Sequence, residues 1–225
     1  MLATSRIPTS AQSGIHAQLP TLLKRHATAP FRKPFADYNR AAFDASLERR
    51  ERLAPDAPLI LDAGCGVGES SIALARAFPG HYVIGVDQSA ARLRRGEPGE
   101  QPKKQPDNLD LVRADLVDYW RLLRDAGLRI DRHYLLYPNP WPKIGHLSRR
   151  WHGHPVFGTL LELGGTLECR SNWRIYVEEF SFAVGYLIQR PAPCEPYRPE
   201  SACTPFERKY LNSGHTLFHA VVDLS

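Results

Sequence analysis

The sequence predicts an α/β fold built on a doubly wound, mainly parallel sheet. Short apolar runs alternate along the chain with longer stretches in which apolar residues recur at helical spacing. The first run, at 58–63, enters a turn that holds three closely spaced glycines. Strands that alternate with helices form parallel sheets, in which ligands bind outside the carboxyl ends of the strands. We therefore expect a binding site at that edge.

The strands are expected where the apolar runs are short and end at turn residues. The first three runs each end at, or just before, an acid, and the fourth ends in a proline-rich stretch. The expected strands are PLILDA (58–63), HYVIGVD (81–87), LDLVRAD (109–115), IDRHYLLYP (130–138), GTLECRS (165–171) and HTLFHAVVDL (215–224).

Helices are expected between these strands. The stretch 67–78 carries apolar residues at roughly helical spacing, and 172–189 follows the i, i+3, i+4, i+7 rule over its whole length. The Pro-rich stretches 96–106 and 190–199 are expected to be surface loops. The other expected helices are 36–53, 88–95, 116–127 and 155–164.

Composition indicates one folded domain in a protein of a reducing compartment, such as the cytosol. The chain has 225 residues and is 43% hydrophobic, which suffices for a sizeable core. The four cysteines are widely spread without a C-x-x-C, so neither a zinc ribbon nor a redox dithiol is indicated. No apolar run approaches the length of a membrane span. We expect a cytoplasmic protein with no membrane or metal partner.

Residues 1–36 are expected to be a basic, disordered N-terminal tail, and 37–225 the folded domain. The net charge is +5, and the first acidic residue is Asp37, so the cations before it have no compensating carboxylate nearby. An organelle transit peptide shares this composition. We favour a tail that contacts a polyanion.

The turn after the first strand favours S-adenosylmethionine over a dinucleotide. It reads DAGCGVGE (62–69), with glutamate where the G-x-G-x-x-G fingerprint requires glycine. Gly64, Gly66 and Gly68 let the backbone approach a ligand closely. The Asp62 carboxylate would repel a pyrophosphate but attract the ammonium and sulfonium charges of S-adenosylmethionine.

Two further acids end the next two strands. Asp87 is placed to accept hydrogen bonds from ribose hydroxyls, and Asp115 to receive the adenine amino group. Each of them precedes a helical stretch and could instead be an N-cap. Three successive strands that end in acids, the first entering a glycine turn, together indicate an S-adenosylmethionine site.

The stretch YPNPWPKIGHLSRR (137–150) must be a shaped loop, because its prolines interrupt any strand or helix. It follows the fourth strand and therefore lies at the cofactor edge, where an acceptor would be held. Its NPWPK, with a following histidine and paired arginines, resembles the D-P-W-P-K signature of the tRNA (guanine-N7)-methyltransferases. NWRIY (172–176) resembles that family's T-D-W-x-x-Y, and TPFE (204–207) followed by a Gly-His pair resembles its T-x-F-E…G-H ending.

The resemblance implies a Rossmann-like class I methyltransferase fold that transfers a methyl group from S-adenosylmethionine to N7 of a guanine in the variable loop of tRNA. The cofactor-binding residues that it implies are Asp62, Asp87, Asp115 and Asn139, the last at the catalytic edge. The implied contacts to substrate tRNA are Lys143, Asn172, Thr204, Pro205, Phe206 and Glu207. Basic residues crowded beside an aromatic also predict RNA phosphate contacts at His146, Arg149 and Arg150.

Two residues depart from the family pattern, since Asn139 and Asn172 stand where the family usually has aspartate. An amide is neutral and has one acceptor oxygen. Guanine N7 bears no proton at neutral pH, so methyl transfer needs alignment rather than a general base. The product is cationic, and of the motif acids Glu207 remains to hold the guanine N1–H and amino group.

Other interpretations of these motifs stay open. Asn139-Pro140-Trp141 is similar to the N-P-P-aromatic loop of amino-methyltransferases, with the double proline broken. The two asparagines also fit a protein that binds cofactor and RNA but catalyses weakly. Locally, TPFE (204–207) is a capping box with proline at the first helical position, and Asn172 could cap its helix. His152-x-His154 lacks the spacing of a metal site.

Overall fold

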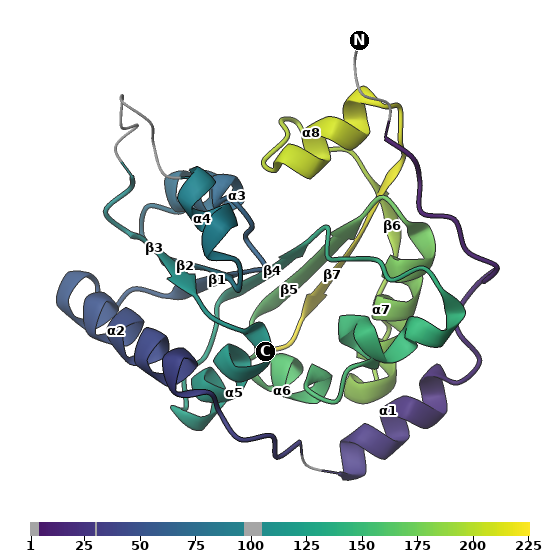
Figure 1. Cartoon of the computed structure of the whole chain (residues 1–225), viewed down its shortest axis with the longest axis horizontal. Helices are drawn as coiled ribbons and strands as arrows, with labels where there is room; N and C mark the ends of the chain where they lie inside the picture. Colours follow the sequence, from purple (N-terminus) through teal and green to yellow (C-terminus); the bar gives the residue numbers. More distant parts are fainter. Residues whose placement is uncertain (1–4, 30, 97–104) are drawn as a thin grey trace.

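A seven-stranded sheet in the order β3-β2-β1-β4-β5-β7-β6 forms the centre of the molecule (Figure 1). The computed structural model describes residues 5–29, 31–96 and 105–225. Strands β1 to β5 run parallel, whereas β7 is antiparallel to β5 and to β6. The strands are β1 Leu59–Ala63, β2 Tyr82–Asp87, β3 Leu109–Arg113, β4 Arg132–Leu136, β5 Thr166–Ser171, β6 Glu195–Tyr197 and β7 Leu217–Asp223.

Helices cover both faces of the sheet. In Figure 1, α3, α4 and α8 lie above the sheet, and α2, α5, α6 and α7 lie below it. The helices are α1 Leu19–Thr28, α2 Asp37–Leu53, α3 Glu69–Ala77, α4 Ala90–Gly96, α5 Leu116–Asp125, α6 Phe157–Glu162, α7 Arg174–Ile188 and α8 Pro205–Asn212, with the short 3-10 helices η1 Ile144–Arg149 and η2 Trp151–Gly153.

Strand β1 shows how the apolar runs build two cores. Successive side chains of a strand point to opposite faces. Leu59, Leu61 and Ala63 join the larger core with α5 and α7, while Ile60 joins the smaller core with α3 and α8. All residues of β1 are buried, as is typical of a central parallel strand. The glycine turn that follows therefore starts from a firmly held point.

The predicted doubly wound fold is confirmed, because every predicted strand and helix has a counterpart in the structure. One prediction was wrong: the stretch 190–199 contains strand β6 in addition to loop. Pro196 can lie in this strand because β6 is at the edge of the sheet, where a missing N–H is tolerated. The predicted loop at 96–106 lies mostly outside the described residues.

The N-terminal segment is folded onto the domain where the structure describes it, contrary to the expected disordered tail. Helix α1 contacts α7, and its Leu19 and Leu23 are buried in the larger core. The segment before it is also tied down, since Ser5 N donates a hydrogen bond to Ser213 Oγ over 3.0 Å. In the described part of the chain, no helix is both long and apolar enough to span a bilayer.

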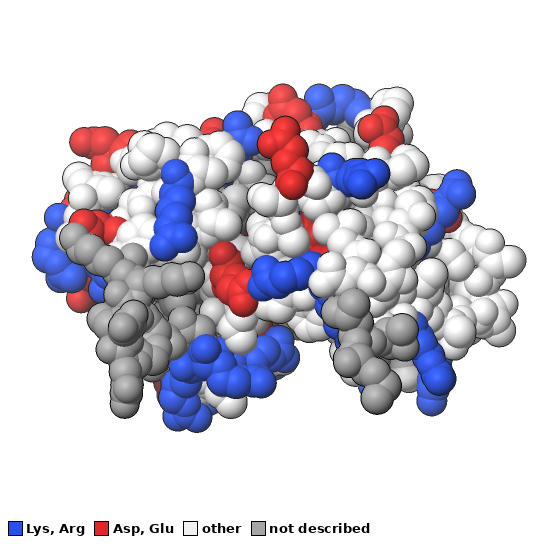
Figure 2. Space-filling model, turned by 90° about the horizontal axis from the view of Figure 1, so that it is seen from above, with Lys and Arg blue, Asp and Glu red and all other residues white. Residues whose placement is uncertain are grey.

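Charge is unevenly distributed over the surface. Lys and Arg side chains gather along the lower edge of the view in Figure 2. Residues 5–36 and 138–161 contain no Asp or Glu. These two segments touch, because Ser10 Oγ donates a hydrogen bond to the Pro142 carbonyl and α1 contacts η2. We call them together the acid-free surface.

Candidate active site

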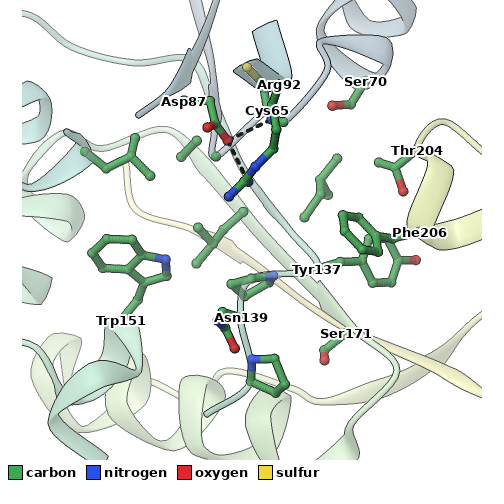
Figure 3. Close-up of a pocket in the computed structure, with 18 of the residues that line it drawn as sticks. Cys65, Ser70, Asp87, Arg92, Tyr137, Asn139, Trp151, Ser171, Thr204 and Phe206 are labelled. Carbon is green, nitrogen blue, oxygen red and sulfur yellow. Dashed lines mark hydrogen bonds and ion pairs between the residues drawn. The ribbon is translucent and has the colours of Figure 1, made fainter. Parts of the chain in front are cut away.

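A cavity of about 860 Å³ opens at the carboxyl ends of the parallel strands (Figure 3). Its lining runs from the glycine turn to the loop after β4 and on to the start of α8. The predicted site residues that line it are Gly64, Gly66, Asp87, Asp115, Asn139, Arg149, Asn172, Thr204, Pro205 and Phe206. The predicted residues outside its lining are Asp62, Gly68, Lys143, His146, Arg150 and Glu207.

The turn between β1 and α3 requires glycine. Gly64, Gly66 and Gly68 have φ of +80°, +62° and +77°, a region that other residues rarely adopt. A Cβ on Gly68 would also lie 3.0 Å from Cδ1 of Leu111, whereas one on Gly66 would meet nothing within 4 Å. The positive φ thus requires glycine at all three positions, and Gly64 and Gly66 expose backbone to the cavity.

Asp62 braces this turn from behind. Its buried carboxylate accepts hydrogen bonds from Ser70 Oγ and Ser71 Oγ, each over 2.6 Å, at the start of α3. Burial raises the pKa of Asp62, and the two serine hydrogen bonds oppose that shift. The side chain thus fixes α3 against β1, an arrangement that does not provide the predicted direct contact with a cofactor.

Asp87 holds the second acidic position at the cavity. Its Oδ2 accepts from Gly66 N over 3.0 Å and from Arg92 Nη1 over 3.1 Å, and its Oδ1 accepts from Ser89 N over 2.8 Å. Figure 3 shows the ion pair with Arg92 beside the cavity. Arg92 is 46% exposed while Asp87 is 3% exposed, so the arginine is an exchangeable partner of a fixed carboxylate.

Asp115 is confirmed as an N-cap, and its predicted contact with the adenine amino group stays a prediction. Its carboxylate caps α5 by accepting a hydrogen bond from Val117 N over 2.9 Å. The same residue lines the cavity. A cap uses one oxygen of the carboxylate, so the other can face a ligand.

The loop at 137–143, here named the acceptor loop, is held in an unusual backbone shape. Tyr137 and Trp141 have φ of +51° and +44°, which is strained for side chains other than glycine. Tyr137 N donates to the Arg170 carbonyl over 2.8 Å, and the Arg150 guanidinium donates to the Trp141 carbonyl over 3.1 and 3.2 Å. These bonds hold both strained residues and leave Asn139 exposed at the cavity.

Glu207 supports the acceptor loop instead of facing the cavity. Its carboxylate is fully buried and accepts from Tyr137 Oη over 2.6 Å, from Arg170 Nη1 over 3.2 Å and from Cys203 N over 2.8 Å. Burial and the adjacent Glu207 raise the pKa of Tyr137 far above its usual range, so the phenol stays a donor. The predicted substrate contact of Glu207 is therefore corrected to a structural role, because its oxygens are already used.

The start of α8 brings an aromatic side chain to the cavity. Thr204 is confirmed as the N-cap, since its Oγ1 accepts from Glu207 N over 2.9 Å, but the Glu207 carboxylate accepts from Cys203 N and so does not complete the capping box. Pro205 begins the helix, and Phe206 is 50% exposed where it lines the cavity. An exposed phenyl ring at the edge of a cavity is a surface on which a nucleic-acid base can stack.

Arg150 belongs to a buried network, and its predicted contact with an RNA phosphate is wrong. The guanidinium is fully buried and forms an ion pair with Glu179, which is also fully buried. His152 Nε2 donates to the same carboxylate over 2.9 Å, and His16 N over 2.9 Å. Gln12 also donates to it. Sequence could not tell the buried arginine of the pair from the exposed Arg149.

The charges of this network can be assigned. Burial alone would raise the pKa of Glu179, but hydrogen bonds and charge from His152 and Arg150 lower it to about 2. Burial lowers the pKa of His152, and its Nδ1 has no hydrogen-bond partner. Glu179 is therefore an ionised carboxylate that pairs with the Arg150 guanidinium.

The remaining basic residues stay near the acceptor loop. Arg149 is exposed and stacks over the Trp141 ring at 4.8 Å from its centroid. The His146 ring packs edge-on against the same indole, with centroids 5.5 Å apart. Lys143 is exposed at the end of the loop. These three keep their predicted phosphate or substrate contacts as a prediction.

Several cavity residues were missed from the sequence. Arg92 and Arg95 line the cavity from α4, which follows Asp87. Two arginines so soon after Asp87 are the sequence feature that could have predicted them. Trp151 and Ser171 carried no motif that singles them out. Tyr210 lies one helical turn after Phe206, and their rings stack with centroids 6.2 Å apart.

Fold and site together define a methyltransferase of the doubly wound class. Residues 56–220 match the profile of a protein family described as "Putative methyltransferase". In three dimensions the chain is similar to the 16S rRNA methyltransferase KamB, with a TM-score of 0.59, 18% identity, and coverage of 86% of this chain and 95% of that one. A likeness at this identity concerns the fold.

Curated relatives narrow the class. The tRNA (guanine-N(7)-)-methyltransferase of Klebsiella pneumoniae is 32% identical over 196 residues, 80% of this chain and 77% of that protein. The protein of the same name from Saccharophagus degradans is 30% identical over 213 residues, 87% of this chain and 88% of that protein. The chain belongs to the tRNA (guanine-N7)-methyltransferase family.

Proposed function

We propose that this protein transfers a methyl group from S-adenosylmethionine to N7 of a guanine in tRNA. One observation carries the proposal. The motif segments around Asn139, Asn172 and Phe206 are far apart in sequence, yet they line the same cavity as Gly66 and Asp87. Family membership supports the same activity. The absence of membrane-spanning helices among the described residues and the free cysteines are compatible with a cytoplasmic site of action, which we include in the proposal.

The residues at the glycine turn fit S-adenosylmethionine. The open side of Gly66 lets backbone approach the ligand, Asp87 would accept from ribose hydroxyls, and Asp115 from the adenine amino group. Asp62 adds negative charge behind the turn, which favours a cationic ligand over a phosphate. When bound, S-adenosylmethionine supplies a methyl group on a positively charged sulfur.

The acceptor side has to align a base, since guanine N7 already carries a free lone pair. Phe206 offers its ring face for stacking, and Asn139 and Asn172 offer amide groups to the polar edge of the base. The fixed acceptor loop keeps Asn139 at the cavity without a bound partner to order it. Pre-organised polar groups of this kind stabilise the charge that develops on the base.

Methylation of tRNA followed by digestion to nucleosides tests the proposal. We expect 7-methylguanosine, formed only in the presence of S-adenosylmethionine. A methylated amine in its place would favour the amino-methyltransferase interpretation of Asn139-Pro140-Trp141. Binding of cofactor and tRNA without turnover would favour the weakly catalytic interpretation, and Asn139→Asp with Asn172→Asp should then raise activity. No 7-methylguanosine with several tRNAs at low salt would refute the activity.

The acid-free surface is proposed as the path of the RNA backbone. A groove of about 780 Å³ lies between α1 and η1, lined by Arg25 and by residues of η1. Lys24 and Arg25 are exposed on α1, and Lys143 and Arg149 are exposed beside the acceptor loop. Among the ion pairs of the described residues, none involves these four cations. Exposed cations that are not used in such ion pairs are available to a phosphate backbone.

The double variant Lys24→Gln, Arg25→Gln is therefore expected to bind tRNA more weakly. Loss of two phosphate contacts should make the negative slope of log K against log salt shallower by about 1–2. Filter binding at several salt concentrations measures this slope. The matched control is Arg52→Gln, Arg76→Gln, which removes the same charge from exposed positions of α2 and α3. Equal slopes for the two variants would contradict a backbone path over α1.

A further inference from the structure

Asn172 is the first link of a hydrogen-bonded chain that leads away from the cavity. It follows β5 directly, lines the cavity, and is only 5% exposed. Its Nδ2 lies 3.1 Å from Nδ1 of His215, in the turn after α8. On the far side of the ring, Nε2 of His215 lies 3.0 Å from the carbonyl oxygen of Ser5.

The Ser5 carbonyl oxygen determines which atom donates in each of these two hydrogen bonds. A carbonyl oxygen can only accept, so His215 Nε2 must carry a proton and donate to Ser5. In a neutral imidazole the other nitrogen is then an acceptor. Nδ1 therefore accepts from the Asn172 amino group. The Asn172 side-chain oxygen takes no part in these hydrogen bonds, and Asn172 lines the cavity.

The ring of His215 is fixed by more than these two bonds. It stacks on Tyr210 of α8 with centroids 5.4 Å apart and an interplanar angle of 13°. Burial raises the pKa of Tyr210, so that phenol is uncharged at neutral pH. Ser5, Asn172 and Tyr210 thus contact the ring, and none of these three groups carries charge. Ser5 is itself anchored by its N–H on Ser213.

We propose that His215 is a positioning residue that turns the Asn172 carbonyl oxygen toward the acceptor base. The proposal rests on the function proposed above, because its ligand is the donor edge of guanine, the N1–H and 2-amino group. The oxygen of a neutral amide can accept from those donors as a carboxylate would. An amide can face the base with either its oxygen or its amino group. Because His215 Nδ1 accepts from the Asn172 amino group, the oxygen is the end that faces the base. This chain thus keeps an acceptor where its family usually has an aspartate.

Two substitutions of the same residue test the proposal. In His215→Gln, the amide oxygen can accept from Asn172 and the amide nitrogen can donate to Ser5, so activity should stay within about threefold of wild type. In His215→Ala, the Asn172 amide is free to rotate, and kcat/KM for tRNA should fall about tenfold, the usual scale of one hydrogen bond. The dissociation constant of S-adenosylmethionine should not change in either variant, because Asp87 and the glycine turn do not contact His215. His219→Ala is the matched control, since His219 on β7 pairs with Glu168 and does not line the cavity.

The glutamine variant separates this role from simple packing. A loss of kcat/KM in His215→Ala that is absent in His215→Gln assigns the effect to the two hydrogen bonds of the ring. Equal kcat/KM for His215→Ala and wild type, or equal losses in His215→Ala and His215→Gln, would overturn the proposal. Failure of the proposed function itself would appear differently, as no 7-methylguanosine from wild-type protein.

Discussion

Replacement of Glu179 by alanine is expected to lower the free energy of unfolding by about 3–5 kcal/mol, the usual cost of breaking a buried ion pair from one side. The change leaves the Arg150 guanidinium buried without its counter-charge and removes the acceptor for His152, Gln12 and the His16 N–H. Denaturant unfolding monitored by fluorescence measures the loss. Because Arg150 also holds the Trp141 carbonyl, methyl transfer should fall with stability.

The neighbouring Glu178 gives a matched control. It lies on the same helix and forms an i, i+4 pair with Arg174, whose side chain is 68% exposed. Such a pair contributes about 0.3–0.5 kcal/mol, so Glu178→Ala should be nearly neutral. Similar losses for the two variants would contradict the role assigned to Glu179.

Glu179 should also leave a signature in acid. Although burial opposes it, hydrogen bonds and charge from His152 and Arg150 hold its pKa at about 2, below the ordinary value of 4.5. A carboxyl with a lowered pKa contributes stability that is fully present above the ordinary value and is lost as pH falls through the folded value. The difference in unfolding free energy between wild type and Glu179→Gln should therefore shrink between pH 4.5 and 2.

Replacement of Asp87 by asparagine is expected to weaken S-adenosylmethionine binding by about 10- to 100-fold, the scale of a hydrogen bond to a charged group. The amide has one acceptor oxygen, whereas the carboxylate must serve Gly66 N and Ser89 N as well as the ribose. Isothermal titration calorimetry measures the affinity. A change of less than threefold would show that the ribose is held elsewhere.

Two companion variants define the result for Asp87. Asp110→Asn lies on the neighbouring strand β3, outside the cavity, and should leave the affinity unchanged. Arg92→Ala removes the competing partner of Asp87, so the affinity should stay the same or rise slightly. A large loss in Arg92→Ala would instead make the arginine a cofactor ligand.

The fold could be predicted because its strands are buried by their own apolar composition. The exceptions have physical reasons. Strand β6 is short and contains Pro196, and it exists only because β7 offers it an edge. Helix α1 lies in a basic segment whose charge suggests solvent, and its Leu19 and Leu23 find a core only through contact with α7. Both elements depend on tertiary partners that local sequence does not reveal.

The site was predicted where backbone geometry dictates the residue. Glycines of positive φ at Gly64, Gly66 and Gly68 are such positions. Roles that depend on distant partners could not be predicted. The sequence does not distinguish Arg150 from Arg149, because only the fold brings Glu179 beside Arg150. Likewise, only the fold brings Tyr137 and Arg170 to the Glu207 carboxylate.

The contacts of Ser5 bear on the order in which the protein is completed during synthesis. Ser5 is bonded to Ser213 and His215, partners that are 208 and 210 residues further along the chain. A ribosome makes Ser5 long before its partners, so Ser5 must wait until the chain as far as His215 has emerged. Contacts of such long range also form late in folding. A nascent chain in which β1, β2 and β3 have already paired would thus still lack the contacts of His215 with Ser5 and Asn172.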